Sequence, residues 1–137
     1  IRILGAPNHG VGRPMKVGKE EMMGLLAAVE RYVSLDHKQL LEVYERRVQI
    51  WIQGLNGKGG LSAKRDYPNE AVQPVPRALV QIPDNWSKDQ LVDKLMAGEP
   101  AVSVAPSERL NAILLNPMTV SYEETQIVLE QILKAID

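Results

Sequence analysis

The chain has 137 residues, of which 45% are hydrophobic and 24% charged, a composition typical of a globular domain that buries its own core. Its net charge of −1 argues against a nucleic-acid partner. The absence of cysteine excludes disulfides and thiol nucleophiles, and no apolar run approaches the ~18 residues of a membrane span, so we expect a cytoplasmic protein with no membrane partner.

A glycine-broken basic segment runs from His9 to Lys16, just before the first predicted helix. Backbone N–H groups, the positive end of the helix dipole and the cationic side chains of Arg13 and Lys16 would meet there. Such a spot suits phosphate, sulfate or carboxylate, and His9 could donate a hydrogen bond to the anion. The spacing alone leaves open that all three are ordinary surface residues. We take His9, Arg13 and Lys16 as the candidate anion-binding residues.

Two helices are expected next. Residues 19–33 carry apolar side chains at the helical period and are apolar nearly all round, so we expect this helix to be largely buried in the intact protein. Gly24 within it would permit a close helix contact. The second helix begins after Asp36 as N-cap and ends at the glycine-rich turn 56–60. Its inward stripe is Leu40, Tyr44, Val48, Trp51 and Leu55.

Four strands are expected after the glycine-rich turn. Residues 61–67 alternate as a half-exposed strand does, and residues 76–82 form a second strand. Residues 101–104 and 110–115 predict a hairpin around 106–108. The second strand is expected to turn Ala78, Val80 and Ile82 to one face.

Two capped helices accompany these strands. Ser87 and Gln90 form a capping box for a short helix that ends at Gly98, and Ser121 and Glu124 open the final helix. The final helix is expected to turn Leu129, Leu133 and Ile136 inward.

The resulting order α-α-β-β-α-β-β-α predicts an α+β fold, in which two leading helices precede a small antiparallel sheet with helices on one face. We expect a loop and interdomain helices in residues 1–56 and a small C-terminal α+β domain in residues 57–137. Nothing in the sequence forms a complete catalytic set: the two histidines are far apart, the serines lack a nearby histidine, and no cluster supplies the ligands of a metal.

The motifs resemble those of the pyridoxal-phosphate enzymes of the bacterial selenocysteine synthase (L-seryl-tRNA selenium transferase) group, above all its branch of D-glucosaminate-6-phosphate ammonia-lyases. That branch reads HGIGR, KVGKEE and GLL where this chain has residues 9–13, 16–21 and 24–26. Residues 98–101 and 114–119 resemble the branch's GEPAI and LLNPRTL, with Met118 in place of the arginine.

The resemblance implies the C-terminal portion of a fold type I enzyme, whose large upstream α/β domain holds pyridoxal phosphate through a Schiff base to an upstream lysine. Lys16 and Lys19 do not match that lysine, so this chain alone is expected to be catalytically inert. The resemblance also implies a homo-oligomer and a lyase reaction: the cofactor serves as an electron sink for α-proton removal, followed by β-elimination and loss of ammonia.

An Arg-x-x-Arg pair of the selenocysteine synthases, associated with anionic groups, falls on Arg13 and Lys16. A lysine at the second position replaces a bidentate fork by a point charge, which favours a small phosphorylated or carboxylated amino-acid or sugar-acid substrate over selenium transfer. The alternative from another class is a stand-alone α+β module that binds an anion or drives oligomerisation without catalysis. The sequence leaves open whether Ile1 is a natural start or a truncation point.

Overall fold

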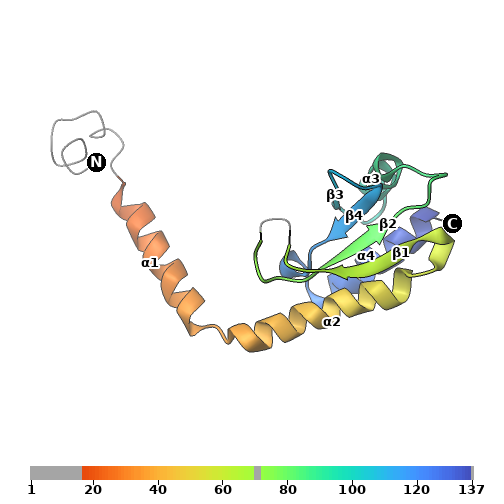
Figure 1. The fold of residues 1–137 in the computed structure, drawn as a ribbon. Helices are drawn as coiled ribbons and strands as arrows, with labels where there is room; N and C mark the ends of the chain where they lie inside the picture. Colours follow the sequence, from red (N-terminus) through yellow and green to blue (C-terminus); the bar gives the residue numbers. More distant parts are fainter. Residues whose placement is uncertain (1–16, 70–71, 137) are drawn as a thin grey trace. The chain divides into compact units, whose positions relative to one another are not determined.

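The computed structural model describes residues 17–69 and 72–136 (Figure 1). Its α+β architecture and the order of its helices and strands confirm the prediction. The elements are α1 (Lys19–Ser34), α2 (His37–Leu55), the 3₁₀ turn η2 (Lys58–Gly60), β1 (Ser62–Asp66), β2 (Arg77–Gln81), α3 (Lys88–Met96), β3 (Ala105–Pro106), β4 (Ala112–Leu115), the 3₁₀ turn η3 (Pro117–Thr119) and α4 (Tyr122–Ile136).

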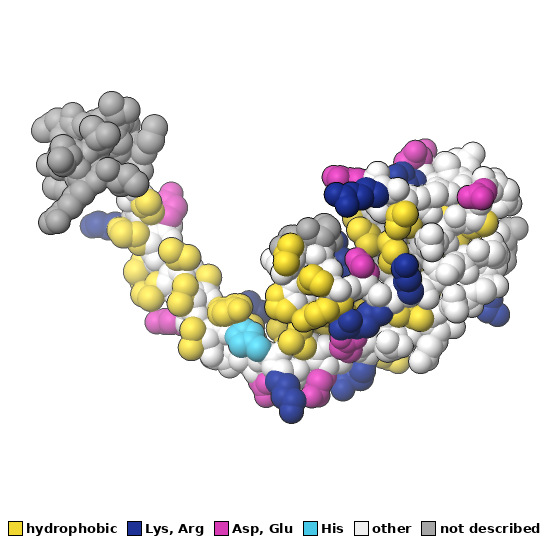
Figure 2. Space-filling model, viewed as in Figure 1, with side chains coloured by type: hydrophobic (Ala, Val, Ile, Leu, Met, Phe, Trp, Pro, Cys, Tyr) yellow, Lys and Arg dark blue, Asp and Glu magenta, His cyan; other side chains and the backbone are white. Residues whose placement is uncertain are grey.

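The chain divides into two compact units, one up to His37 and one from Lys38 onward. In the first unit, α1 carries Glu20 and Glu21 in its first turn, where they complement the helix dipole. None of its residues is buried, and Figure 2 shows apolar side chains along its surface. Five large ones are 49% to 74% exposed: Met22, Leu25, Leu26, Val29 and Val33. The burial expected for this helix in the intact protein stays a prediction.

The second unit is built on a four-stranded antiparallel sheet in the order β1-β2-β4-β3. Ala63 of β1 lies opposite Val80 of β2, and Val80 lies opposite Ile113 of β4. Because side chains alternate along a strand, these three residues share one face of the sheet, and all three are buried. The predicted inward positions Ala78, Val80 and Ile82 are likewise buried.

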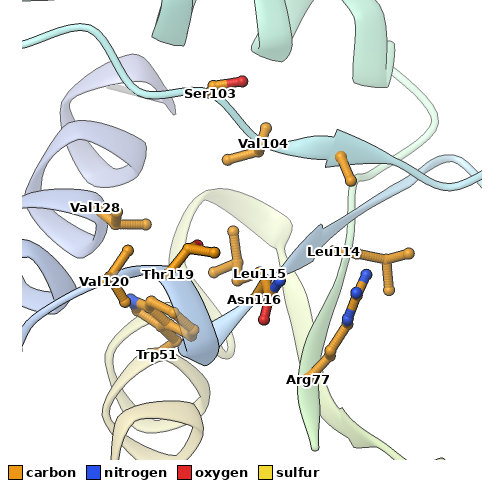
Figure 3. Close-up of a pocket in the computed structure, with 11 residues that line it drawn as sticks. Trp51, Arg77, Ser103, Val104, Leu114, Leu115, Asn116, Thr119, Val120 and Val128 are labelled. Atoms are coloured by element: carbon orange, nitrogen blue, oxygen red, sulfur yellow. The ribbon is translucent and has the colours of Figure 1, made fainter. Parts of the chain in front are cut away.

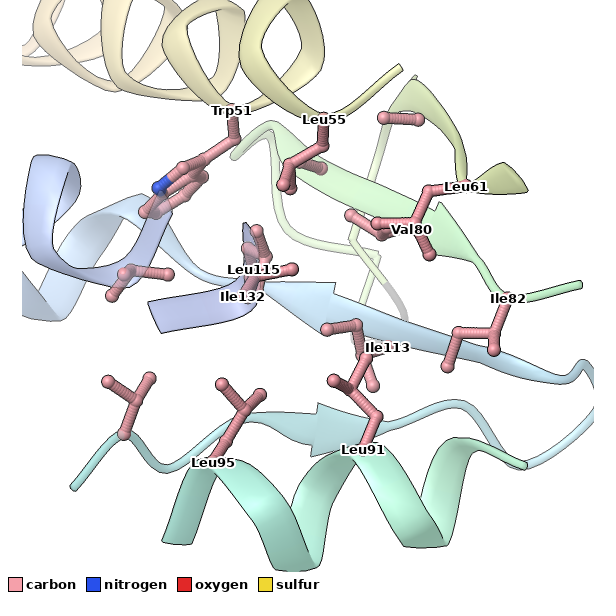
Figure 4. Packing of buried hydrophobic residues seen from close by; sticks show 14 of the residues in the cluster. Trp51, Leu55, Leu61, Val80, Ile82, Leu91, Leu95, Ile113, Leu115 and Ile132 are labelled. Atoms are coloured by element: carbon pink, nitrogen blue, oxygen red, sulfur yellow. The ribbon is translucent and has the colours of Figure 1, made fainter. Parts of the chain in front are cut away.

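Helices α2, α3 and α4 pack on this face of the sheet (Figure 4). The buried cluster joins Trp51 and Leu55 of α2, Leu91 and Leu95 of α3, and Ile132 of α4. The helices therefore cover one face, as predicted. Since α2 contributes to this core, the compact unit begins at 38, ahead of the boundary expected between 56 and 57.

The glycine-rich turn ends α2 as expected. Gly57 adopts a φ of +79°, a conformation that favours glycine, and its N–H donates to the Leu61 carbonyl at 2.8 Å. The side-chain oxygen of Asn56 accepts from the Ala63 N–H at 3.1 Å. The turn thereby connects the end of α2 directly to the start of β1.

The predicted strand at 101–104 is wrong. The Val102 N–H donates to the Leu95 carbonyl at 2.9 Å, so this segment closes the end of α3 instead of joining the sheet. Pairing with β4 starts only at Ala105, and β3 is two residues long.

The inward face of α4 also differs from the prediction by a small rotation. Its buried residues are Thr125, Val128 and Ile132. Leu129, Leu133 and Ile136 are partly buried on the flank of that face, where they pack against the core. In the parts of the chain that the structure describes, no helix combines the length and apolar character needed to cross a membrane.

Candidate functional site

The three predicted anion-binding residues, His9, Arg13 and Lys16, lie outside the described residues. The second matched block, in contrast, is fully described. Residues 114–119 reach a cavity of about 310 Å³ at the end of β2 and β4 (Figure 3). Residues 100–101 line an adjoining hollow, which shares Ser103 and Thr119 with the cavity. The two separated segments of that block therefore meet around one region of the surface.

The cavity has an apolar and a polar part. Trp51, Leu115 and Val128, all buried, contribute the apolar wall together with Val104, Leu114 and Val120. The polar side chains that line it are Arg77, Ser103, Asn116 and Thr119. Such a mixture of apolar surface and few polar groups is typical of small-molecule sites.

Arg77 and Asn116 come from adjacent strands. Arg77 opens β2, Asn116 follows β4, and the pairing of Ala78 with Leu115 brings the two positions next to each other in the sheet. Among the described residues that line the cavity, Arg77 carries the only formal charge. A positively charged side chain therefore lines one side of the cavity.

The turn that carries Asn116 is held from two directions. The side-chain oxygen of Asn116 accepts from the Met118 N–H at 3.0 Å and caps η3. From α2, the Arg47 Nη1 donates to the Pro117 carbonyl at 2.9 Å. Because its oxygen is engaged in the turn, the Asn116 side chain offers its amino group as a donor toward the cavity.

The start of α4 follows directly after this turn. Ser121 Oγ accepts from the Glu124 N–H at 3.2 Å, and the Ser121 N–H donates to Glu124 Oε2 at 2.6 Å, which confirms the predicted capping box. The pKa of Glu123 is lowered by a hydrogen bond from its own backbone N–H, by the Ser121 hydroxyl and by the nearby Arg47. Arg47 thus faces both the turn and the first residues of α4.

A second charged cluster lies on the surface between α2 and β1. Arg65 Nε donates to Glu45 Oε1 at 3.0 Å, and the Arg65 guanidinium lies 4.4 Å from the centre of the Tyr67 ring. The hydrogen bond to Glu45 raises the pKa of Arg65. These contacts join α2 to β1 and to the residue that follows it.

The described lining of the cavity is poor in titratable side chains. Lysine, histidine, aspartate, glutamate and tyrosine do not occur among the described residues that line it. The described residues of the lining supply no amine that could hold pyridoxal phosphate covalently. In the same described part of the chain, no three His, Asp or Glu side chains gather as metal ligands do.

Sequence reasoning missed Arg77. The signal that could have found it is the alternation of the strand at 76–82, which turns Ala78, Val80 and Ile82 toward the helices and Arg77 away from them. The alternation does not reveal the cavity itself, because Trp51, Ser103 and Asn116 reach it from segments far apart in the sequence.

No family model matches the chain. Among curated proteins, 5'-C-glycyluridine monooxygenase-decarboxylase from a Streptomyces species is 31% identical over 100 residues, which cover 71% of this chain and 25% of that protein. Among solved structures, D-glucosaminate-6-phosphate ammonia-lyase matches 93% of this chain and 34% of its own chain, with a TM-score of 0.69 and 24% identity.

The chain therefore spans about a quarter of the curated relative and about a third of the solved chain. Both matched proteins are enzymes by name. The structural likeness establishes that this α+β fold, helices and sheet together, recurs as one part of a larger enzyme chain.

Proposed function

We propose that this chain is the C-terminal domain of a pyridoxal-phosphate-dependent enzyme of the lyase type. Its reaction would remove the α-proton of an amino-sugar acid or another amino acid, with β-elimination and loss of ammonia. The observation that carries the proposal is the match of 93% of this chain to one third of D-glucosaminate-6-phosphate ammonia-lyase. The motif resemblance at residues 16–21 and 114–119 points to the same enzymes.

The exposed apolar surface of α1 supports a larger parent protein. Leu25 is 67% exposed and Val33 is 74% exposed, on a helix that has no buried residue. An apolar helix surface of this kind is usually covered by another protein surface, because exposure of apolar area to water is unfavourable. An upstream cofactor-binding domain of the same polypeptide, in a homo-oligomer, would supply that cover.

The division of roles follows from the side chains. Arg13 and Lys16 would hold an anionic group of the substrate or the cofactor phosphate, with His9 as an additional donor. The lysine that binds the cofactor would come from the upstream domain, in keeping with a cavity near η3 whose described lining residues include no lysine. Residues 1–137 alone would then have no lyase activity.

Ammonia release by the polypeptide encoded by the complete gene tests this proposal. We expect ammonia release from amino-sugar acids, dependent on pyridoxal phosphate. Arg13→Ala and Lys16→Ala should each raise KM by about tenfold or more, since a charge-assisted contact contributes about 1.5–3 kcal/mol. Lys38→Ala, which removes the same charge from an exposed helix position, is the matched control.

Two results would count against the proposal. One is the absence of ammonia release from any amino-sugar acid or common amino acid by the cofactor-loaded protein. The other is an unchanged KM in Arg13→Ala and Lys16→Ala, which would remove the anion-binding role of the basic segment while leaving the lyase reaction in place.

A further inference from the structure

We infer that a hollow formed by α3 and the loop before it binds a neutral monosaccharide. The hollow has a volume of about 490 Å³ and is lined by Asn85, Trp86, Gln90, Asp93 and Lys94. It shares no lining residue with the cavity at the end of β2 and β4. The inference goes beyond the proposed lyase reaction and does not depend on it.

Trp86 forms an aromatic side of the hollow and is held in place. Its side chain is partly buried and packs against the core. Its N–H donates to the Pro83 carbonyl at 3.0 Å, and its carbonyl accepts from Asn111 Nδ2 at 2.8 Å. Because the ring is already ordered, a ligand that packs on it loses little binding free energy to side-chain ordering. The C–H groups of a sugar ring are a suitable apolar surface for such packing.

Lys94 restricts the ligands that the Trp86 ring can accept. Its ammonium lies 4.5 Å from the centre of the Trp86 ring, and its Nζ donates to the Ala135 carbonyl at 2.9 Å. A ligand cation at the ring would be repelled by this ammonium, and a flat base stacked on the same face would have to displace it. An ammonium has three N–H donors, so Lys94 still has donors for a ligand oxygen.

The charges of the lining balance each other. Asp93 and Lys94 are the charged side chains among the described residues that line the hollow. No hydrogen bond or ion pair within the described part of the chain engages the Asp93 carboxylate. An ionised carboxylate only accepts hydrogen bonds, so its ligand must be a donor, and an anion such as phosphate would be repelled. A neutral ligand with hydroxyl groups meets both requirements.

Gln90 adds donors to the same hollow. Its Oε1 accepts from the Ser87 N–H at 3.1 Å in the capping box of α3, so its amide nitrogen is the group that remains for a ligand. The hollow therefore combines donors on Gln90 and Lys94 with an acceptor on Asp93. A sugar hydroxyl both donates and accepts, and a monosaccharide carries several on adjacent carbons. Its hydroxyl groups and its C–H surface together match the polar and the aromatic part of this lining.

Amide NMR spectroscopy of the 137-residue chain, titrated separately with D-glucose and D-galactose, tests the site. We expect at least one sugar to cause saturable shifts confined to residues 85–94 and the Trp86 indole N–H. The Trp51 indole N–H, which donates to the Thr125 carbonyl inside the core, should not shift. Choline, caffeine, inorganic phosphate and glycine represent a cation, a flat base, an anion and a zwitterion. Each should bind at least about tenfold more weakly than the better sugar.

Asp93→Ala should weaken sugar binding by about tenfold or more, because hydrogen bonds to a charged acceptor are lost. Asp89→Ala removes the same charge from an exposed position of α3 outside the lining and should bind normally. Trp86→Ala should abolish the shifts. Since Trp86 packs against the core, Asp93→Ala, at an exposed position, decides the outcome should Trp86→Ala fail to fold.

Three outcomes would overturn the inference. No saturable shift with either sugar at about a hundred millimolar, or shifts spread over the whole surface, would show that the hollow is not a sugar site. Tighter binding of choline, caffeine, phosphate or glycine than of both sugars would replace the sugar by that class of ligand. Full binding by Asp93→Ala would place the sugar elsewhere on the chain.

Discussion

Asn111 joins three segments around the edge of the sheet through a single side chain. Its oxygen accepts from the Lys88 N–H at 2.8 Å, and its amino group donates to the carbonyls of Trp86 at 2.8 Å and Ile82 at 3.3 Å. The start of α3 and the end of β2 are thereby fixed to the residue before β4.

Replacing Asn111 by alanine should lower the free energy of unfolding by about 1–3 kcal/mol, because partly buried backbone groups lose their partners. Urea unfolding measures this difference. Asn85→Ala, at an exposed position of the neighbouring loop, should change the free energy by no more than about 0.5 kcal/mol. Equal effects of the two variants would contradict the bridging role of Asn111.

The ionisation of Glu123 makes the free energy of unfolding depend on pH. Its pKa is lower in the folded chain than its ordinary value, because its own backbone N–H and the Ser121 hydroxyl stabilise the carboxylate. The stabilisation is therefore present above the ordinary glutamate pKa and is lost as the pH falls through the folded-state pKa.

The unmodified chain should thus be more stable than Glu123→Gln near neutral pH, and the gap should close in acid. Urea unfolding at a series of pH values measures the difference in free energy of unfolding between the two chains. A difference that stays constant from neutral to acidic pH would show that the loss comes from packing and not from ionisation.

At the scale of helices and strands, α2 and α4 approach each other closely at Gly54. A Cβ built on Gly54 would lie 2.6 Å from both terminal methyl groups of Leu129. Real Cβ atoms do not approach other atoms so closely, so any larger residue at this position requires the Leu129 side chain, which packs against the core, to shift.

Gly54→Ala should therefore destabilise the chain by about 1–3 kcal/mol, the usual effect of overpacking. In a Leu129→Ala background the same substitution should instead stabilise by about 0.5–1 kcal/mol, the helix preference of alanine over glycine. A double-mutant cycle in urea measures the coupling. Additive effects would mean that the two side chains do not compete for space.

Elements with strong local signals were predictable from the sequence. The capping boxes at Ser87 and Ser121, the long stripe of α2 and the glycine-rich turn each depend on neighbouring residues, and each lies where it was expected. The short strand β3 depends instead on pairing with β4 and on the Val102 hydrogen bond to Leu95, which no local pattern encodes.

The candidate site was predictable only in part. The second matched block indicated residues 114–119, which include Asn116 and Thr119 of the cavity. Arg77 and Trp51 join them only through the packing of β2 and α2 on β4, a tertiary arrangement without a sequence motif. The predicted roles of His9, Arg13 and Lys16 stay predictions, since these residues lie outside the described ones.

At the scale of the whole molecule, the exposed apolar surface of α1 should make the isolated chain prone to self-association. We expect it to self-associate or bind a hydrophobic dye, and Leu26→Gln with Val29→Gln should reduce both effects. Lys19→Gln with Glu30→Gln leaves the net charge unchanged and is the matched control on the same helix. Light scattering measures self-association, and dye fluorescence measures dye binding. A monomer that binds no dye would contradict the proposal that another protein surface covers α1.

The intact mass of the native polypeptide, isolated from its source and reduced with borohydride, tests most directly whether this chain is one domain of a pyridoxal-phosphate enzyme. We expect a polypeptide about three times as long as this chain, which covers 34% of the matched solved chain. That polypeptide should carry one reduced cofactor on a lysine outside residues 1–137. A native protein of 15.2 kDa without a cofactor adduct would contradict the account.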